Sequence, residues 1–167
     1  MLRFKAHRPP LGRPLCAISI VVACAAAGML VSAQAFMFQI ANPVAAQDFR
    51  FKSAAFVFRT VGCAEPAKPE ITGRAEGLVN GSRQSLALKI VPAAAKPGVY
   101  AVIQNWPAEG RWVVNLNGSC AGMTAGAVIP VGPKGIVRES SKLLPHAASD
   151  AEVEAALKSA PEQGESK

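Results

Sequence analysis

The sulfur-containing side chains are the strongest candidates for chemistry in this sequence. Cys120 and Met123 lie close together in Cys-Ala-Gly-Met, and His146 follows in a separate segment. Thiolate, thioether and imidazole groups are ligands that copper prefers, so Cys120, Met123 and His146 form a candidate copper site. Their spacing departs from the copper loop, in which a histidine follows the cysteine after a few residues. No C-x-x-C pair is present to favour zinc.

The cysteines also have a simpler interpretation. Two of the four, Cys16 and Cys24, lie in an apolar segment near the N-terminus, which leaves Cys63 and Cys120 for the rest of the chain. In an exported protein such a pair predicts a Cys63–Cys120 disulfide, with free thiols or metal ligands as the alternative. The disulfide would remove the thiolate that the candidate copper site needs.

Groups suited to catalysis are scarce. His146 is the only histidine outside the first segment, and no G-x-S-x-G motif accompanies the serines. The glutamates are scattered singly, and such residues are most often solvated surface. We therefore predict a protein that is not an enzyme and needs no cofactor, with a small enzyme as an alternative.

Three residues could form a contact patch. Trp112 alternates with apolar neighbours along a predicted strand and is best placed in the core, whereas Trp106 precedes the turn Pro-Ala-Glu-Gly. A ring at that turn, beside Tyr100 or Arg111, could bind a partner, because aromatic and arginine side chains dominate binding surfaces. Packing over the end of the strands is the competing interpretation for Trp106.

The N-terminal segment has the pattern of an export signal. Four bases precede an apolar run at 15–31, and no charged residue occurs between Arg13 and Asp48. Small residues with the spacing of a cleavage site end at Ala35 and again at Ala46, which predicts cleavage after one of them. Retention as a membrane-spanning anchor, or lipidation at Cys24 within Val-Ala-Cys, are the alternatives. Each of them places the following domain outside the cytoplasm, in the periplasm or secreted.

The net charge of +7 does not indicate nucleic-acid binding. Residues 1–13 contribute +4 with no acid, so the other 14 bases and 11 acids of the chain give only +3. These remaining bases are dispersed, with no basic stripe interleaved with aromatic residues. The expected partner is an envelope protein or a small ligand, and membrane contact is expected only through an uncleaved N-terminal segment.

Beyond this segment the sequence predicts an all-β domain. Short alternating runs are separated by turn residues at intervals of about ten, as in sandwiches and barrels. Asn80-Gly81 predicts a type I′ hairpin between 71–79 and 85–91, and Pro-Ala-Glu-Gly predicts a second hairpin between 99–104 and 111–116. A run at 127–131 contains Pro130 and is expected to lie at an edge or to stop early.

The C-terminal part departs from this pattern. Ser149-Asp150-Ala151-Glu152 predicts a capping box that opens a helix ending near Ser159. Val153, Ala156 and Leu157 would give this helix a thin apolar stripe, so it either docks on the domain or stays detached. Residues 161–167 are expected to be disordered. The predicted organisation is a signal or anchor at 1–46, a β-sandwich at 47–140, and a helix and tail at 141–167.

The segment from Pro97-Gly98-Val99-Tyr100 to Trp106-Pro107-Ala108-Glu109-Gly110-Arg111-Trp112 resembles hairpins of small bacterial periplasmic immunoglobulin-like sandwich domains. Some of those domains take part in copper handling and respiratory-oxidase assembly. The resemblance implies a small antiparallel immunoglobulin-like sandwich. The metal-binding histidines that the copper proteins carry near the mature N-terminus are missing, and residue 118 is Gly where the immunoglobulin pattern has Tyr. We therefore expect an exported binding or accessory module, with a periplasmic copper-handling protein as the alternative.

Overall fold

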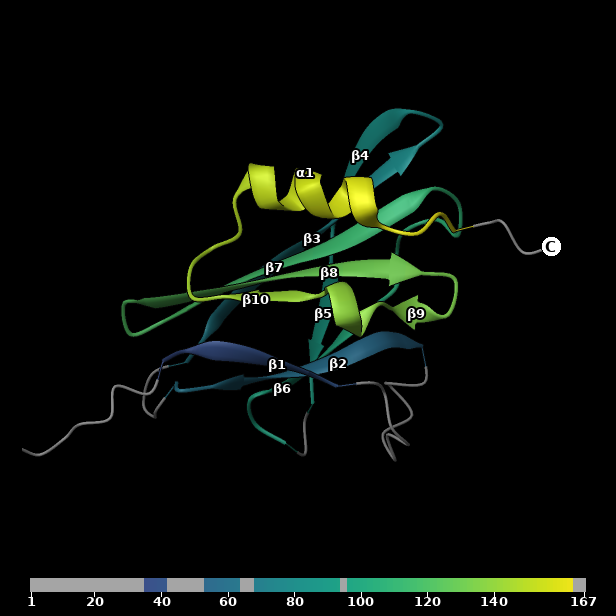
Figure 1. The fold of residues 1–167 in the computed structure, drawn as a ribbon. Coiled ribbons are helices and arrows are strands. Elements are labelled where there is room, and N and C mark those ends of the chain that lie inside the picture. The colour runs from purple at the N-terminus through teal and green to yellow at the C-terminus, as the bar shows by residue number, and fades with distance from the viewer. Residues whose placement is uncertain (1–34, 42–52, 64–67, 94–95, 164–167) are drawn as a thin grey trace, which may run out of the picture. The chain divides into compact units, whose positions relative to one another are not determined.

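The computed structural model describes residues 35–41, 53–63, 68–93 and 96–163. Almost all of their regular structure is antiparallel β-sheet, with one α-helix near the C-terminus (Figure 1). The prediction of an all-β fold with a short C-terminal helix is therefore confirmed. No helix in these four ranges is long and apolar enough to cross a membrane.

The strands form two sheets. The smaller sheet has four strands, in the order β1 (Met37–Ala41), β2 (Ala54–Val61), β6 (Val99–Ile103) and β5 (Lys89–Pro92). The larger sheet has the order β10 (Lys142–Leu144), β8 (Met123–Gly132), β7 (Arg111–Cys120), β3 (Glu70–Val79) and β4 (Ser82–Ala87), and β9 (Gly135–Ile136) also pairs with β8. A short 3₁₀ helix, η2 (Arg138–Ser140), and helix α1 (Asp150–Ser159) complete the elements.

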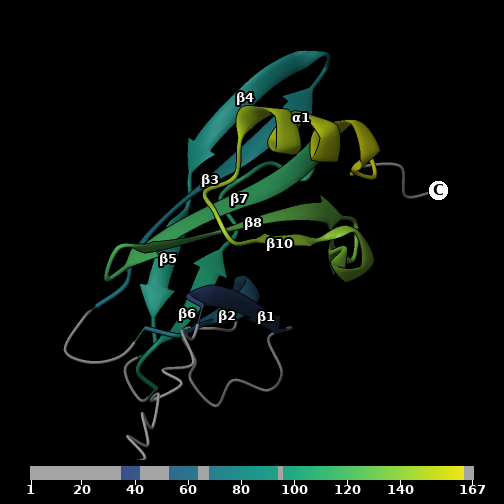
Figure 2. The same ribbon diagram turned by 60° about the vertical axis from the view of Figure 1, so that its left-hand side comes forward.

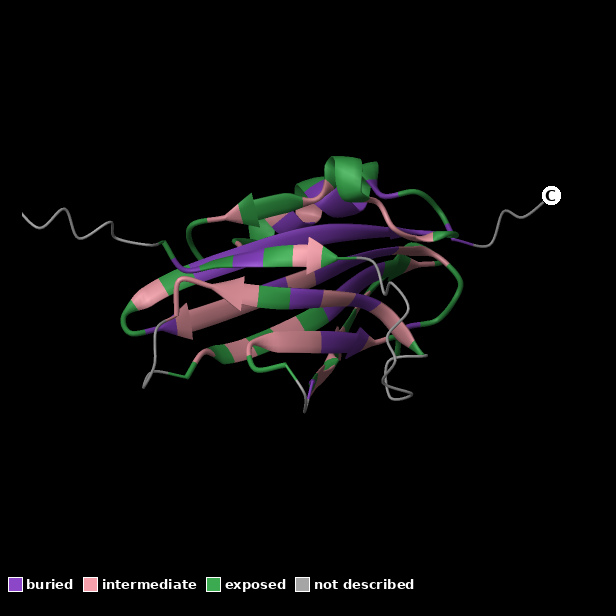
Figure 3. Ribbon diagram, turned by 90° about the horizontal axis from the view of Figure 1, so that it is seen from below, coloured by how far each residue is buried: buried purple, intermediate pink, exposed green. Residues whose placement is uncertain are grey.

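The two sheets enclose the main hydrophobic core. Side chains from the smaller sheet, including Phe56, Phe58 and Val102, meet Trp112, Leu116 and other residues of the larger sheet. Helix α1 covers the opposite face of the larger sheet, so the larger sheet is the middle layer (Figures 1 and 2). As a result β8 is almost entirely buried, and buried residues concentrate along the central strands (Figure 3).

The first predicted hairpin is confirmed. Asn80 and Gly81 have φ angles of 50° and 76°, as a type I′ turn requires, and Val79 pairs with Ser82 across it. The following strand is not continuous, however. At Leu88 the chain leaves the larger sheet, and β5 then pairs with β6 of the smaller sheet. One run of alternating residues thus contributes to both sheets.

The second predicted hairpin is wrong. β6 pairs with β2 and β5, whereas β7 pairs with β3 and β8 in the other sheet. Alternation identified both strands, but it carries no information about which strands become neighbours. The connection over 104–110 is longer than the two to five residues usual in hairpin loops, and it crosses between the sheets.

Pro130 lies in an interior strand, not at an edge. β8 has β7 on one side and both β10 and β9 on the other. β10 pairs with β8 as far as Val128 and β9 pairs with β8 from Val131, so Pro130 occupies the gap between the two. Its carbonyl accepts a hydrogen bond from Val137 N–H on that side. The missing N–H therefore interrupts no strand pairing.

The sheet begins earlier than residue 47, where the sequence analysis started the β domain. β1 pairs with β2 along five positions, from Met37–Val61 to Ala41–Val57. Phe36 and Phe38 are buried in the main core. The predicted leader of residues 1–46 therefore includes a strand of the sheet, and its composition concealed this because β1 is apolar and uncharged like the residues before it.

The predicted Cys63–Cys120 disulfide is present, with 5.7 Å between the two Cα atoms. Cys63 follows β2 of the smaller sheet, and Cys120 ends β7 of the larger sheet. The bond thus joins the two sheets covalently across a sequence separation of 57 residues.

Replacing both cysteines, Cys63→Ala with Cys120→Ala, should lower the free energy of unfolding by about 4 kcal/mol, because the unfolded chain regains the entropy that a loop of this length removes. Denaturant unfolding of the variant and of the oxidised wild type measures the difference. Reduced wild type should unfold like the variant. A loss below about 1 kcal/mol in both would contradict the entropic role of the bond.

Candidate functional site

Helix α1 begins at the predicted capping box. The Ser149 hydroxyl oxygen accepts a hydrogen bond from Glu152 N–H, and the Glu152 carboxylate accepts one from Ser149 N–H at 2.8 Å. Asp150 and Glu152 in the first turn and Lys158 in the last also suit the helix dipole. These contacts fix where the helix starts and hence which side chains it turns toward the sheet.

Docking of α1 confirms one of the two predicted alternatives. Val153, Ala156 and Leu157 are buried against Val113 of β7 and Val128 of β8. The face of β7 that carries Val113 is therefore covered, because the apolar stripe of the helix packs against it.

The chain remains ordered after the helix. Gln163 N–H donates to Gly110 O at 2.7 Å, and the buried Gln163 side-chain amide donates to Val131 O. Residues 161–163 are therefore held against the larger sheet, although we expected disorder from 161 onward; residues 164–167 lie outside the described ranges. This attachment brings Glu162 within 3.4 Å of Arg111.

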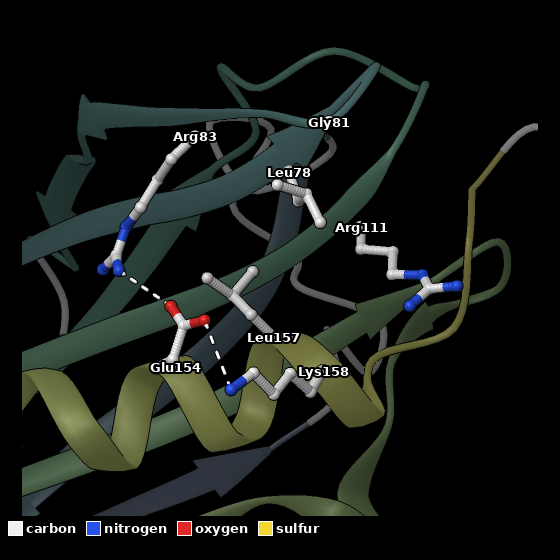
Figure 4. Close-up of a pocket in the computed structure, with 7 residues that line it drawn as sticks. All are labelled: Leu78, Gly81, Arg83, Arg111, Glu154, Leu157 and Lys158. Atoms are coloured by element: carbon white, nitrogen blue, oxygen red, sulfur yellow. Dashed lines mark hydrogen bonds and ion pairs between the residues drawn. The ribbon is translucent and has the colours of Figure 1, made fainter.

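A groove separates α1 from the β3–β4 hairpin. It has a volume of about 230 Å³. We call it the hairpin–helix groove, and its lining residues are Leu78, Gly81, Arg83, Arg111, Glu154, Leu157 and Lys158 (Figure 4). Three of the seven are cations and one is an acid, while Leu78 and Leu157 supply apolar surface.

Glu154 is the central charge of the groove. Its two carboxylate oxygens lie 3.0 Å from Arg83 Nη1 and 3.7 Å from Lys158 Nζ, so the carboxylate bridges β4 and α1 (Figure 4). Arg83 is also 3.6 Å from the buried carboxylate of Glu76, which receives a hydrogen bond from Ser85 and lies near Arg74. Burial of Glu76 is tolerable because it has these hydrogen-bonding and charged partners.

The cations keep donors for a further anion. The side chains of Arg83, Arg111 and Lys158 are 43%, 39% and 74% exposed. A guanidinium has five N–H donors and an ammonium three, and each of these side chains has only one or two acidic partners here. The arrangement therefore suits an anionic group, such as a carboxylate, attached to a short apolar stem that contacts Leu78 and Leu157.

Two other hollows have less charged chemistry. One of about 510 Å³ lies where β4 leaves the larger sheet, and Arg74 is its only charged lining residue. The other, of about 290 Å³, lies beside β9 and Pro161 and has mostly glycine, proline and aliphatic walls, with Lys134 and Glu139 at its margin. Neither is lined by several cations together with apolar side chains, so the hairpin–helix groove is the best candidate.

The candidate copper ligands are not brought together. Cys120 is bonded to Cys63, so its thiolate is not available. Met123 packs against the main core on the inner face of β8. The His146 backbone lies beside Gly126, on the outer face of that strand. In the described part of the chain, no three His, Cys, Asp or Glu side chains are grouped as metal ligands would be.

The candidate contact patch is also dispersed. Trp106 is 4% exposed and belongs to the core, so packing accounts for it. Tyr100 stacks on Phe58 with ring centroids 5.3 Å apart, and burial raises the pKa of its hydroxyl. Arg111 is the one member with an accessible charged end, and it lines the hairpin–helix groove.

The nearest approach to a catalytic constellation is Ser149, His146 and Glu152. His146 Nε2 lies 3.9 Å from the Glu152 carboxylate. The Ser149 hydroxyl, however, donates to Glu152 at 2.7 Å and not to the imidazole. A serine nucleophile needs a base that takes its proton, and a third group that orients that base. Because the Ser149 hydroxyl bonds to Glu152 directly, these three residues do not form such a series of nucleophile, base and orienting group. The capping box accounts for the Ser149–Glu152 contacts.

Of the charged groove residues, only Arg111 was predicted as a contact residue, whereas Arg83, Glu154 and Lys158 looked like ordinary surface charges. Gly81 and Leu157 were predicted only for their roles in the turn and the helix. The Asn80-Gly81 turn and the capping box did predict the two walls of the groove, which are the β3–β4 hairpin and helix α1. Their proximity depends on how α1 docks, which no local pattern encodes. Comparison of the chain with family models, curated proteins and solved structures finds no match.

The stability of helix α1, which forms one wall of the groove, should depend on pH through Glu152. Hydrogen bonds from Ser149, first from its backbone N–H and then from its hydroxyl, lower the pKa of Glu152 below its ordinary value of 4.5. A lowered folded-state pKa stabilises the fold above the unfolded pKa, and this stability is lost as pH falls through the folded pKa. The melting temperature of wild type should therefore drop more steeply below about pH 4.5 than that of Glu152→Gln, whose amide oxygen still accepts from Ser149 N–H.

Melting followed by circular dichroism from pH 6 to pH 3 tests this expectation. Glu139→Gln, on the separate helix η2, is the control, and its melting temperature should fall with pH as steeply as that of wild type. If the melting temperatures of wild type and Glu152→Gln fall equally steeply, the role of the capping carboxylate is contradicted.

Proposed function

We propose that this chain is an exported, non-catalytic binding module of the cell envelope, and that it binds its ligand in the hairpin–helix groove. The ligand carries a carboxylate or similar small anion on an apolar stem. It belongs to an envelope protein or is a small molecule of the same chemistry.

The observation that carries the proposal is that three cations, Arg83, Arg111 and Lys158, line one groove together with the apolar side chains of Leu78 and Leu157. Charge-assisted hydrogen bonds to a carboxylate are roughly twice as strong as neutral ones, and a guanidinium group can bind it through two donors. The groove volume of about 230 Å³ is below the roughly 300–1,000 Å³ of typical ligand pockets. A group projecting from a larger partner, or a small acid, fits this size better than a complete cofactor.

Export is supported by two observations. The basic N-terminal segment followed by an apolar run is typical of a signal sequence. The Cys63–Cys120 disulfide suits an oxidising compartment such as the periplasm. An immunoglobulin-like architecture is part of the same proposal, supported by two antiparallel sheets around one core and by a disulfide that joins them.

Binding can be tested with hexanoate, which carries a carboxylate on an apolar stem, and with hexanamide as its neutral counterpart. We expect hexanoate to shift backbone amide NMR signals of Leu78, Arg111 and Leu157, and hexanamide to shift them much less. Arg111→Gln or Lys158→Gln should each weaken hexanoate binding about tenfold, because loss of a charge-assisted hydrogen bond costs about 1.5 kcal/mol or more.

Lys134→Gln is the matched control, because it removes one exposed positive charge at another hollow. It should bind hexanoate like wild type. A groove that gives no shifts with hexanoate, or equal weakening in all three variants, would overturn the proposed site. Phosphate as a second probe distinguishes recognition of any small anion from a requirement for the apolar stem.

A further inference from the structure

We propose that the export signal is cleaved after Ala35, so that the mature protein begins at Phe36, and that the second candidate site, after Ala46, is not used. This inference rests on the export part of the proposed function. The residues that the folded domain must keep identify the processing site.

β1 is the first element that the domain cannot lose. Phe36 and Phe38 are 2% and 1% exposed and belong to the main core. Their ring centroids are 5.8 Å apart, and the ring of Phe38 meets that of Phe58 edge-on at 5.5 Å. Cleavage after Ala46 would remove both rings and leave a cavity between the sheets.

The larger sheet has a space shaped for these rings. A Cβ atom on Gly118 of β7 would lie 2.7 Å from Phe38 Cζ and 3.0 Å from Phe36 Cε1. Residue 118 therefore has no side chain where the two phenylalanines enter from the opposite sheet. If Phe36 and Phe38 were removed, Gly118 would supply no side chain to replace their rings.

β1 also completes the smaller sheet. It pairs with β2 at five positions, and Gln39 Oε1 accepts a hydrogen bond from Arg59 Nε at 2.7 Å. Removing β1 would expose the backbone groups of β2 on that side, and a newly exposed strand edge favours aggregation. A chain starting at Gln47 would thus lose core filling and edge protection together.

Cleavage after Ala35 leaves every described strand of the domain intact. Ala35 is exposed, precedes β1, and occupies the last position of Ala33-Gln34-Ala35, where cleavage sites have small residues. A leader of 35 residues is also nearer than one of 46 to the usual length of about 15–30. The boundary between leader and domain therefore falls between Ala35 and Phe36.

The test is the N-terminus of the full chain expressed with its own leader in a bacterial host. Intact mass and N-terminal sequencing of the soluble envelope fraction should give a protein that begins at Phe36. Ala46→Leu should give the same mature N-terminus. Ala35→Leu should accumulate as an unprocessed precursor, because a large residue now stands at the last position of the site.

Other outcomes would overturn the inference in distinguishable ways. A soluble envelope protein that begins at Gln47, in wild type or in Ala35→Leu, would overturn it and leave export intact. So would a full-length chain in the membrane with its domain outside the cytoplasm, or a lipid-bearing chain that begins at Cys24. A full-length chain found only in the cytoplasm would overturn both the processing site and the export part of the proposed function. The wild-type N-terminus alone decides the matter if Ala35→Leu is degraded.

Discussion

Burial of the larger sheet on both of its faces is the constraint on which the rest of this structure depends. β7 and β8 form its centre, with the main core on one side and α1 on the other. Consecutive residues of β7, from Trp112 to Val114, are therefore all fully buried. A strand in this position must be apolar on both faces, which explains why the alternation expected of a half-exposed strand is weak here. The helix is thus an integral layer of the domain.

Tight packing within and between the sheets also fixes where side chains must be absent. Gly77 pairs with Trp112 across β3 and β7, and a Cβ atom on Gly77 would lie about 2.5 Å from the indole ring. Gly118 makes the corresponding space for Phe36 and Phe38. Large aromatic rings on one strand and glycine opposite them allow a dense core without steric overlap. The same glycines appear in the sequence only as weak strand formers, because their role depends on a partner far along the chain.

The sequence could predict features that depend on neighbouring residues. Asn80-Gly81 located the first hairpin, Ser149 and Glu152 located the start of α1, and the cysteine count identified the disulfide. It could not predict how the later strands pair: the runs at 99–104 and 111–116 looked like a hairpin, but β6 and β7 lie in different sheets. β1 was hidden because apolar residues continue from the predicted leader into the strand. The groove could not be predicted because its residues come from β4, β7 and α1, which are far apart in the sequence and form the groove only after the helix has docked.

Docking of the helix and charge in the groove depend on different interactions. α1 is held by burial of Val153, Ala156 and Leu157, and each such side chain can contribute on the order of 1–3 kcal/mol. The ion pairs of Glu154 with Arg83 and Lys158 are substantially exposed, and pairs of this kind contribute about 1 kcal/mol or less. The cations are therefore not required to hold the groove together. The apolar interface of the helix holds the groove walls in place, so binding of the proposed ligand to these cations would cost the fold little.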